Sequence, residues 1–453
     1  MGMSVTEAIL EAETKVRGTH LRLVGGSTAG ELSPERAPRT RIVFLSHYFP
    51  PEGNAPASRV HEMCKRWVAA GHEVTVITCA PNHPNGRVYP GYRNWPIQQE
   101  FVDGIRVIRV WTFLAANRGK RRRAINFVSY MISAMAVALY IRRPDVLIAT
   151  SPQFFCGWAG VMVSALKRLP FILEVRDIWP ESIRAVGAAR RRFLIWFLER
   201  MEQQMYASAY RIVTVGAGYK EKLIERRVPA AKIDIVTNGV DREFLGGVND
   251  SAAVRERFQL KGKFVCAYVG TIGMASGLKV VLRAAKILEE KGRDDVRLML
   301  VGDGAIREEL EQEAKRQNLK NVIFTGRLDR RQIPGLLSAV DACLVHLRKT
   351  DLFESVLPSK IFEAAGMSKP IILGVRGHAA RLVQAAQAGI CIEPENEHEL
   401  VAAIERLSAD RELGESLGRS GHDYVLRNFD RDSLARDYFH LIRGTIESCP
   451  IVV

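Results

Sequence analysis

The feature of this sequence that most constrains its fold is a repeated order of apolar strand, glycine-containing loop and helix. Residues 41–47 predict a strand, followed by a proline-rich loop whose one permissive joint is Gly53. A helix is predicted over residues 57–70, where Gly71 ends it, and a second strand over residues 73–78. A strand–loop–helix–strand unit of this kind predicts a parallel sheet, because parallel neighbours need a crossover between them.

The same order begins again after a turn at residues 238–241. A strand is predicted over residues 264–269, a loop over 270–277, a helix over 278–291 and a strand over 296–301. We therefore predict an α/β fold of two facing, doubly wound, Rossmann-like domains, with ligands bound where the strands end. The predicted parts are a poorly ordered extension (1–40), domains at 41–237 and 251–430, a linker (238–250), and a C-terminal helix within 431–453 that crosses back to the first domain.

The charge and the cysteines of the 453-residue chain limit its partners and its compartment. A formal net charge of +15 favours anionic partners, and composition alone does not choose among nucleic acid, anionic lipid and phosphorylated substrates. The seven cysteines have no paired spacing and no CxxC, so we expect neither a disulfide framework nor a metal site. Free thiols indicate a reducing compartment, the cytosol.

The stretch LPSKIFEAAGMSKP, residues 357–370, carries the clearest candidate ligands. Pro358 is expected at the first position of a short helix over residues 359–367. Lys360 and Glu363 are three residues apart, so they share a face near the positive end of that helix. An ammonium for phosphates and a carboxylate for vicinal hydroxyls suit a sugar nucleotide. The alternative is a solvated Lys/Glu pair on an ordinary helix.

Glycine-containing loops follow several predicted strands. The loop GTIGMASG at residues 270–277 lets the backbone approach a diphosphate, although a plain tight turn is the alternative. Gly302-Asp303-Gly304 is interpreted as structural. Gly53 would make a similar approach from the first domain, where Glu52, Asn54 and Arg59 could reach the cleft; the alternative is a rigid loop with solvated polar residues.

A dense polar cluster ends the strand predicted over residues 171–175. The segment from Glu174 to Ser182 reads EVRDIWPES, and it includes Arg176 and Asp177. Buried strands do not normally end in four charges beside a tryptophan and a proline. Since polar residues at the carboxyl ends of strands face the cleft in this architecture, we favour a functional role over a structural one.

Two basic segments suggest contact with an anionic membrane. The uncharged run at residues 124–141 follows the basic stretch from Arg118 to Arg123 and just reaches the length of a membrane span. Strands on both sides favour a buried domain helix with a basic patch lying on the membrane. The segment from Arg190 to Phe197 repeats the basic-then-aromatic order of an interfacial surface. The alternative for each segment is a solvated helix end.

Ten segments, in order along residues 41–430, carry a resemblance to a known family. They are YFPPEGNAPASRV, RWVAAGHEVTVIT, PNHPNGRVYPGYR, DGIRVIRV, EVRDIWPESI, NGVD, YVGTIGMASGL, LVGDG, FTGRL and LPSKIFEAAGMSKPII. Through them the chain resembles the retaining glycosyltransferases of family 4, which have the GT-B fold. Within that family it is similar to the subgroup that builds bacterial O-antigen and exopolysaccharide, which includes N-acetyl-L-fucosaminyltransferases.

The resemblance implies a role for each matching residue. Glu363 matches the second Glu of the E-x7-E motif and would bind the nucleotide ribose, while the first Glu falls on Ser355, one residue after Glu354. Lys360 would bind the diphosphate. The remaining donor-side candidates are Gly270, Thr271 and Gly273 for phosphate, Gly326 and Arg327 for the base, and Gly53 beside the phosphates. Arg176 and Asp177 stand where the family has a His-Asp pair, so the catalytic candidates are Lys360, Glu363, Arg176 and Asp177. Asn54, Arg59 and His83 are expected on the acceptor side.

The resemblance also implies an activity. We expect transfer of a hexose or N-acetylaminosugar from a UDP-sugar to a saccharide on a polyprenyl diphosphate lipid, at the cytoplasmic face of the plasma membrane. No cofactor and no metal are expected. The alternatives are a sugar-nucleotide epimerase of the same fold and a basic nucleic-acid-binding protein. A nucleic acid partner is not expected, because no RRM, KH or helix-turn-helix signature is present.

Overall fold

The structure is a computed structural model that describes residues 39–83, 85–115, 120–142, 144–151, 153–178, 192–246 and 250–449. Several sequence-based predictions fall outside these residues. They are the extension as far as residue 38, residues 179–182 of the polar cluster, residues 118–119 and 190–191 of the two basic segments, residues 247–249 of the linker and residues 450–453 of the C-terminal segment. The elements described below all belong to one compact unit, Thr40–Val453.

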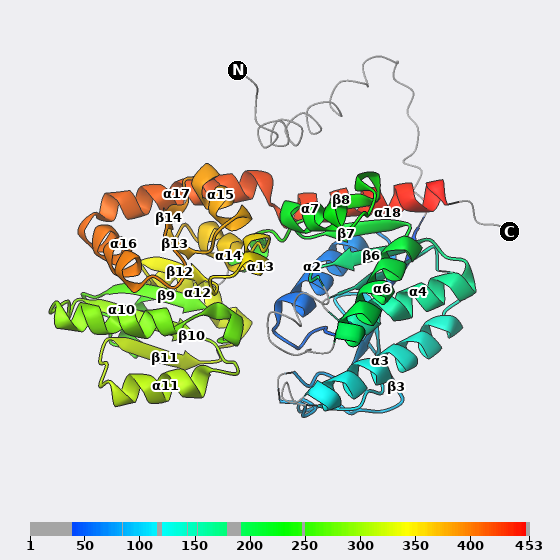
Figure 1. Cartoon of the computed structure of the whole chain (residues 1–453), viewed down its shortest axis with the longest axis horizontal. Helices are drawn as coiled ribbons and strands as arrows, with labels where there is room; N and C mark the ends of the chain where they lie inside the picture. The colour runs from blue at the N-terminus through cyan, green and yellow to red at the C-terminus, as the bar shows by residue number, and fades with distance from the viewer. Residues whose placement is uncertain are drawn as a thin grey trace, which may run out of the picture. The chain divides into compact units, whose positions relative to one another are not determined.

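The first sheet has eight strands in the order β3-β4-β2-β1-β5-β6-β7-β8 (Figure 1). All neighbours are parallel except β3 and β4, as the βαβ pattern predicts. The strands are β1 (Arg41–Leu45), β2 (Glu73–Cys79), β3 (Ile97–Val102), β4 (Ile105–Val110), β5 (Val146–Thr150), β6 (Phe171–Val175), β7 (Arg211–Thr214) and β8 (Ile233–Ile235).

Two helical layers cover this sheet. One face carries α3 (Lys120–Tyr140), α4 (Phe154–Lys167), α6 (Arg192–Ser208) and α7 (Ala217–Glu225). The other face carries α2 (Ala55–Ala69) and, from the far end of the chain, α18 (Arg431–Ser448). Asn54 begins α2 as its N-cap, and its side-chain oxygen accepts from the backbone N–H of Ala57 at 2.9 Å.

The second sheet has six parallel strands in the order β11-β10-β9-β12-β13-β14 (Figure 1). The strands are β9 (Phe264–Val269), β10 (Val296–Val301), β11 (Val322–Gly326), β12 (Ala342–His346), β13 (Ile371–Gly374) and β14 (Gly389–Cys391). The helices after β8 are α8 (Arg242–Leu245), α9 (Ser251–Arg257), α10 (Lys279–Glu290), α11 (Arg307–Arg316), α12 (Ile333–Ala339), α13 (Asp351–Glu354), α14 (Lys360–Gly366), α15 (His378–Ala385), α16 (Glu397–Ala409) and α17 (Arg411–Asn428). Three 3-10 turns, η1 (Ala230–Lys232), η2 (Met274–Ser276) and η3 (Arg330–Gln332), complete the elements of the residues that the structure describes.

These two doubly wound sheets and the returning helix confirm the predicted fold class. Helix α18 packs on α2, where the indole N–H of Trp67 donates to the carbonyl of Ala435 at 3.0 Å. The chain passes between the two sheets twice, near Val240 and near Phe429. These two segments lie side by side, since the N–H of Val240 donates to the carbonyl of Phe429 at 2.9 Å. The boundaries proposed for the individual domains stay predictions.

Three elements differ from those predicted from the sequence. No element was predicted over strand β3, whose alternating pattern, IQQEFV, contains three polar residues. A tight turn at Asp103-Gly104, both with positive φ, joins it to β4, and Asp-Gly is a strong hairpin signal. The sequence pattern predicts a helix over residues 161–168, and the observed helix α4 begins earlier, at Phe154. Helix α14 begins at Lys360 with Ser359 as N-cap, so Pro358 precedes the helix instead of opening it.

Candidate functional site

The loops at the carboxyl ends of β9 and β10 fit together through glycines. A Cβ atom on Gly302 would lie 2.0 Å from the carbonyl oxygen of Gly270, and one on Gly304 would lie 2.3 Å from that of Ile272. The neighbouring backbone could not move far enough to accommodate a side chain at either glycine. The structural interpretation of Gly302-Asp303-Gly304 therefore agrees with the packing, since these glycines seat the loop that starts at Gly270.

The loop from Gly270 to Gly273 presents free backbone donors. The N–H of Gly270 donates to Val301 at 2.8 Å and that of Ile272 to Asp303 at 3.0 Å. The N–H groups of Thr271 and Gly273, by contrast, have no hydrogen-bond partner among the residues that the structure describes. Two donors in one short loop can bind oxygens of an anionic group.

Lys360 lies against this loop. Its Cε atom is 2.3 Å from the position that a Cβ atom would take on Gly270. Its ammonium contacts the hydroxyl of Tyr268 and lies 3.8 Å from the centre of that ring. The structure therefore brings Lys360 to Gly270, and the alternative of a solvated Lys/Glu surface pair does not describe this lysine.

Glu363 lies one turn further along α14 and is half-buried. Its carboxylate makes no hydrogen bond or ion pair within the described part of the chain, including none with Lys360. Helix α14 has only seven residues, so the predicted contribution of its positive end is small, and the two side chains themselves are the candidate ligands.

Arg327 connects the second sheet to the loops of the first. Its Nη1 atom donates to the hydroxyl of Tyr89 at 3.0 Å, and its Nη2 atom lies 3.3 Å from where a Cβ atom would stand on Gly53. Gly326, with a φ of +72°, makes the turn that aims this side chain. The predicted donor-side residues Gly53 and Arg327 therefore meet, and Tyr89 is an addition that the sequence did not indicate.

Glu52 holds the loop that carries His83 next to Gly53. It is 3% exposed, and its carboxylate accepts from the N–H groups of Asn82 at 2.8 Å and His83 at 2.9 Å. Burial raises the pKa of this carboxyl group to about 6, against those hydrogen bonds. Burial and the nearby cation of Arg327 lower the pKa of His83, so this side chain is neutral at neutral pH.

Two of the three residues predicted on the acceptor side, Asn54 and Arg59, have structural roles. The side-chain oxygen of Asn54 caps α2. Arg59 is 4% exposed; its Nε donates to Glu174 at 3.2 Å, and its two terminal nitrogens donate to the carbonyls of Val236 and Thr237, both at 2.7 Å. Arg59 therefore fixes the chain where it leaves the first sheet. The prediction that it contacts an acceptor is wrong for a physical reason, because its donors are used internally.

The pair Arg176-Asp177 follows β6 at the carboxyl edge of the first sheet. The Nε and Nη1 atoms of Arg176 are buried and make no hydrogen bond to any described residue. Burial lowers the pKa of Arg176 to about 10, so it stays cationic at neutral pH. Donors buried without partners are costly, which makes Arg176 a candidate ligand for an anion. The same strand end also holds Glu174, whose pairing with Arg59 is structural.

The sugar-side candidates Glu354 and Ser355 differ from each other. Ser355 is buried, and its hydroxyl donates to the carbonyl of Leu352 at 3.0 Å. A Cβ atom on Gly218 of α7 would lie 2.7 Å from the Cα of Ser355, so this residue marks a contact of α7 with the second sheet. Glu354 is exposed and lines a cavity of about 260 Å³ together with Arg348 and Thr350. We therefore assign Ser355 a packing role and keep Glu354 as a ligand candidate.

Comparisons with known proteins decide what kind of enzyme has this geometry. A family model described as glycosyl transferases group 1 matches residues 250–423, and a glycosyl transferase 4-like domain model matches residues 54–239. The chain is a glycosyltransferase of the GT-B fold.

Relatives of this glycosyltransferase match most of its length. A putative colanic acid biosynthesis glycosyl transferase, WcaI, of Escherichia coli K12 is 24% identical over 89% of this chain and 100% of that protein. A GDP-mannose-dependent alpha-mannosyltransferase of Mycolicibacterium smegmatis is 25% identical over 82% of this chain and 89% of that protein. Anabaena HepE, solved in complex with UDP and glucose, aligns with a TM-score of 0.67 at 16% identity, over 90% of this chain and 100% of that one.

The glycosyltransferase also has an exposed apolar face outside this site. Helices α3, α4 and α6 pack on the same side of the first sheet and lie beside one another (Figure 1). Their outer sides, which we call the apolar helical face, expose Ile125, Ile132, Leu139, Tyr140, Met162, Leu166, Phe193, Trp196 and Phe197. The exposed cations of Arg121, Arg122 and Arg123 stand at one end of α3.

Helix α3 is less buried than predicted from the sequence. Arg121–Tyr140 is the one helix in the described ranges with the length and composition of a membrane span, and only 28% of its apolar window is buried. Tyr130, Ala134 and Ala138 pack toward the sheet, while Ile125 and Ile132 do not. The prediction of a domain helix is therefore correct for one side of α3, and its opposite side is an exposed apolar surface.

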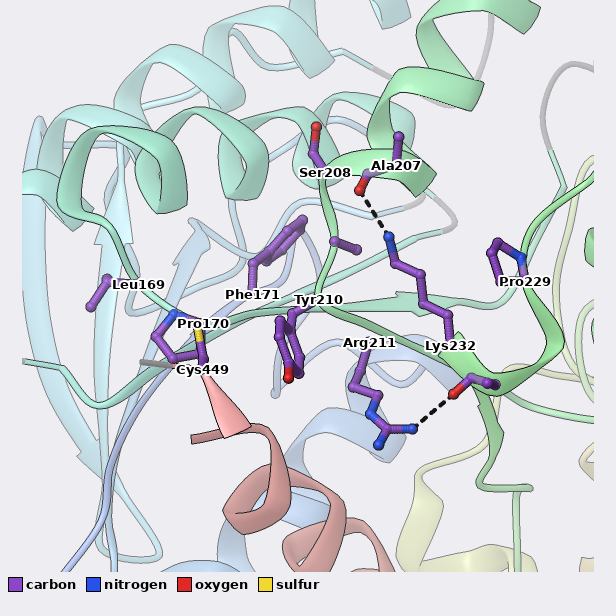
Figure 2. Close-up of a pocket in the computed structure, with 12 residues that line it drawn as sticks. Leu169, Pro170, Phe171, Ala207, Ser208, Tyr210, Arg211, Pro229, Lys232 and Cys449 are labelled. Atoms are coloured by element: carbon purple, nitrogen blue, oxygen red, sulfur yellow. Dashed lines mark hydrogen bonds between the residues drawn. The ribbon is translucent and has the colours of Figure 1, made fainter. Parts of the chain in front are cut away.

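A second cavity of the glycosyltransferase lies away from the candidate site. It has a volume of about 650 Å³ and is lined by residues before and at the starts of β6 and β7, by residues that precede β8, and by Cys449, at the amino edge of the first sheet (Figure 2). The two cationic side chains that line this cavity already have hydrogen-bond acceptors. Lys232 donates to the carbonyl of Ala207 at 2.8 Å, and Arg211 donates to that of Ala231 at 3.0 Å. The candidate ligands described above all stand at the opposite, carboxyl edges of their sheets.

Proposed function

We propose that this glycosyltransferase moves a sugar from a UDP-sugar, with retention of configuration, to a saccharide carried on a polyprenyl diphosphate lipid. The product is part of a bacterial cell-surface polysaccharide, and the enzyme works at the cytoplasmic face of the plasma membrane. The similarity to WcaI, whose name places it in colanic acid biosynthesis, supports the polysaccharide class. The similarity to HepE, solved in complex with UDP and glucose, supports the donor class.

The observation that carries the proposal is the position of Lys360 beside the Gly270 loop. Its ammonium and the N–H groups of Thr271 and Gly273 supply three cationic or polar donors within one short region. A leaving nucleoside diphosphate gains negative charge in the transition state, and fixed donors of this kind stabilise it. The carboxylate of Glu363 suits the two ribose hydroxyls, and Arg327 suits the edge of the base.

Sugar transfer here needs no covalent role for any named side chain. Lys360, the loop amides and Arg176 would lower the cost of breaking the bond between the sugar and the diphosphate. Approach of the two sheets, with Arg327 already contacting Tyr89, would exclude water and so favour transfer over hydrolysis. The expectation that neither cofactor nor metal is needed stays part of this proposal.

The apolar helical face supports the membrane half of the proposal. Its aromatic side chains are strongly exposed: Phe193 by 75%, Trp196 by 58% and Phe197 by 47%. Exposed aromatic rings and clustered arginines are each typical of surfaces that lie in the headgroup region of an anionic bilayer. An enzyme seated by this face meets a lipid-linked acceptor at the membrane surface.

The proposal is tested first with donors. Purified protein is screened by thermal shift against UDP, GDP and their sugars, because a relative is named for GDP-mannose. Consumption of the stabilising donor is then measured with and without membrane lipid extract. We expect turnover only with extract, and a loss of about 10²- to 10³-fold in Lys360→Ala. Glu363→Ala should chiefly weaken donor binding. Lys286→Ala, an exposed lysine of α10, is the matched control.

The other outcomes identify the rival functions. Conversion of a UDP-sugar without any acceptor would indicate an epimerase. A salt-dependent shift with DNA or RNA, and none with any nucleotide sugar, would indicate a nucleic-acid-binding protein. Unchanged turnover in both Lys360→Ala and Glu363→Ala would remove the donor site from α14.

A further inference from the structure

Tyr268, near the end of β9, is a buried tyrosine whose hydroxyl is bonded on two sides. The side chain is 1% exposed, and its hydroxyl donates to the carbonyl of Thr271 at 2.8 Å. The ammonium of Lys360 contacts the same hydroxyl oxygen and lies over the ring. Because a tyrosine hydroxyl has a single hydrogen, given to Thr271, its oxygen can only accept from the lysine.

This arrangement fixes one peptide group of the glycine loop. The carbonyl of Thr271 accepts from Tyr268, and the N–H of Ile272, in the same peptide plane, donates to Asp303 at 3.0 Å. A peptide plane held at both ends cannot rotate. The N–H groups on either side of it, those of Thr271 and Gly273, are therefore kept in place for a ligand.

The same hydroxyl fixes the lysine. An unrestrained lysine samples many rotamers, because its ammonium ends a flexible four-carbon stem. Lys360 is confined by the ring of Tyr268 and by Gly270, whose missing Cβ leaves the path of its stem open. One of its three N–H donors goes to Tyr268, so two remain for an anion.

We propose that Tyr268 is a positioning residue, which sets both Lys360 and the Thr271 peptide for binding of the donor's diphosphate. It does not touch the ligand, and it acts through Lys360 and the loop. This inference rests on the proposed function, since it assumes that Lys360 binds the diphosphate. It adds a residue that the sequence pattern, a tyrosine within an apolar strand, did not distinguish from core.

Tyr268→Phe tests the hydroxyl alone, because the ring and its packing remain. We expect kcat/KM for the nucleotide sugar to fall about tenfold, the size of one lost hydrogen bond to a charged group. Tyr130→Phe is the matched control. Tyr130 is equally buried, and its hydroxyl donates to the carbonyl of Ile77 at 2.8 Å in the first domain. The control should lose similar stability and keep its kinetics.

A double-mutant cycle with Lys360→Met separates positioning from general weakening. If Tyr268 acts through Lys360, Tyr268→Phe should change kcat/KM less than about twofold in the Lys360→Met background. An equal loss in both backgrounds would overturn the inference, as would wild-type kinetics in Tyr268→Phe. If Lys360→Met itself behaves as wild type, the proposed donor site fails. If Lys360→Met loses kcat/KM while Tyr268→Phe keeps wild-type kinetics, the donor site is supported and the positioning role of Tyr268 is rejected.

A second measurement covers the case in which Tyr268→Phe does not fold. Binding of the UDP diphosphate to Lys360, with the ammonium still on the Tyr268 hydroxyl, places an anion beside this ring, so the near-ultraviolet tyrosine spectrum of the wild-type protein should change. The same titration of Lys360→Met should lack that change at saturating UDP. Identical tyrosine spectra for the two proteins would overturn the inference.

Discussion

The Cε atom of Lys360 lies 2.3 Å from the point where a Cβ atom would stand on Gly270. Gly270 also has a φ of +139°, a conformation that other residues rarely adopt. A loop residue and the first residue of α14, far apart in the chain, are thus matched to each other. The glycine leaves a path for the lysine, and the lysine places a cation over the loop.

Gly270→Ala should therefore impair donor use more than stability. The new methyl group displaces the flexible lysine stem, and the backbone strain costs about 1–3 kcal/mol in the free energy of unfolding. We expect at least about a tenfold loss in kcat/KM for the nucleotide sugar. Gly262→Ala is the control, because Gly262 has a φ of +68° but nothing within 4 Å of its Cβ position. Equal kinetics in the two variants would contradict the contact.

Arg59→Met should destabilise the fold strongly. It leaves Glu174, which is 1% exposed, as a buried carboxylate without its cation, and losses of this kind are about 3–5 kcal/mol. Urea unfolding measures the change. Arg41→Met removes a half-exposed pair with Asp145 and should cost less than about 1 kcal/mol. A stable Arg59→Met protein with a raised KM for acceptor would return this residue to the acceptor site.

Stability should depend on pH through Glu52. Burial raises the pKa of its carboxyl group to about 6, above the unfolded value of about 4.5, so the folded protein favours the protonated form. The stability that protonated Glu52 contributes is fully present below the unfolded pKa and is lost as pH rises through the folded pKa. Between about pH 5 and pH 8 the loss is about 1 kcal/mol.

Glu52→Gln should remove that pH-dependent loss. Between about pH 5 and pH 8, the free energy of unfolding should fall about 1 kcal/mol more in the wild type than in Glu52→Gln. Glu256→Gln, at an exposed position on α9, is the control and should follow the wild type. A wild type and a Glu52→Gln protein with parallel pH profiles would show that the carboxyl group is not perturbed.

The apolar helical face should bind vesicles that contain anionic lipid. Removing the ring in Trp196→Ala should weaken binding to such vesicles about tenfold, since an interfacial indole loses its contact with the headgroup region. Met274→Ala removes an equally exposed side chain, 58% in each case, from the turn η2 that follows β9. Co-sedimentation compares the two variants. The membrane contact would lie elsewhere if the two variants bound anionic vesicles equally. It would also lie elsewhere if binding persisted on vesicles of neutral lipid only.

Several parts of the site could be predicted from the sequence because their signals are local. Gly270 follows a strand directly, and Lys360 and Glu363 share one short helix. The Asp103-Gly104 turn is likewise a local signal, for the hairpin of β3 and β4. The internal role of Arg59 could not be predicted, because an arginine near a loop in the sequence gives no sign that its donors end on Val236 and Thr237.

Two parallel sheets, the loops at their carboxyl edges and the charged residues that stand there could all be derived from the chain's residue order. Those features follow from strand and helix periodicity and from glycine, whose effects extend over a few residues. Which side chains are used, and for what, depends on the folded molecule. Tyr268 meets Lys360, and Arg327 reaches Tyr89, over 92 and 238 positions of sequence. Such contacts arise from the packing of separate elements, and no local pattern records that packing.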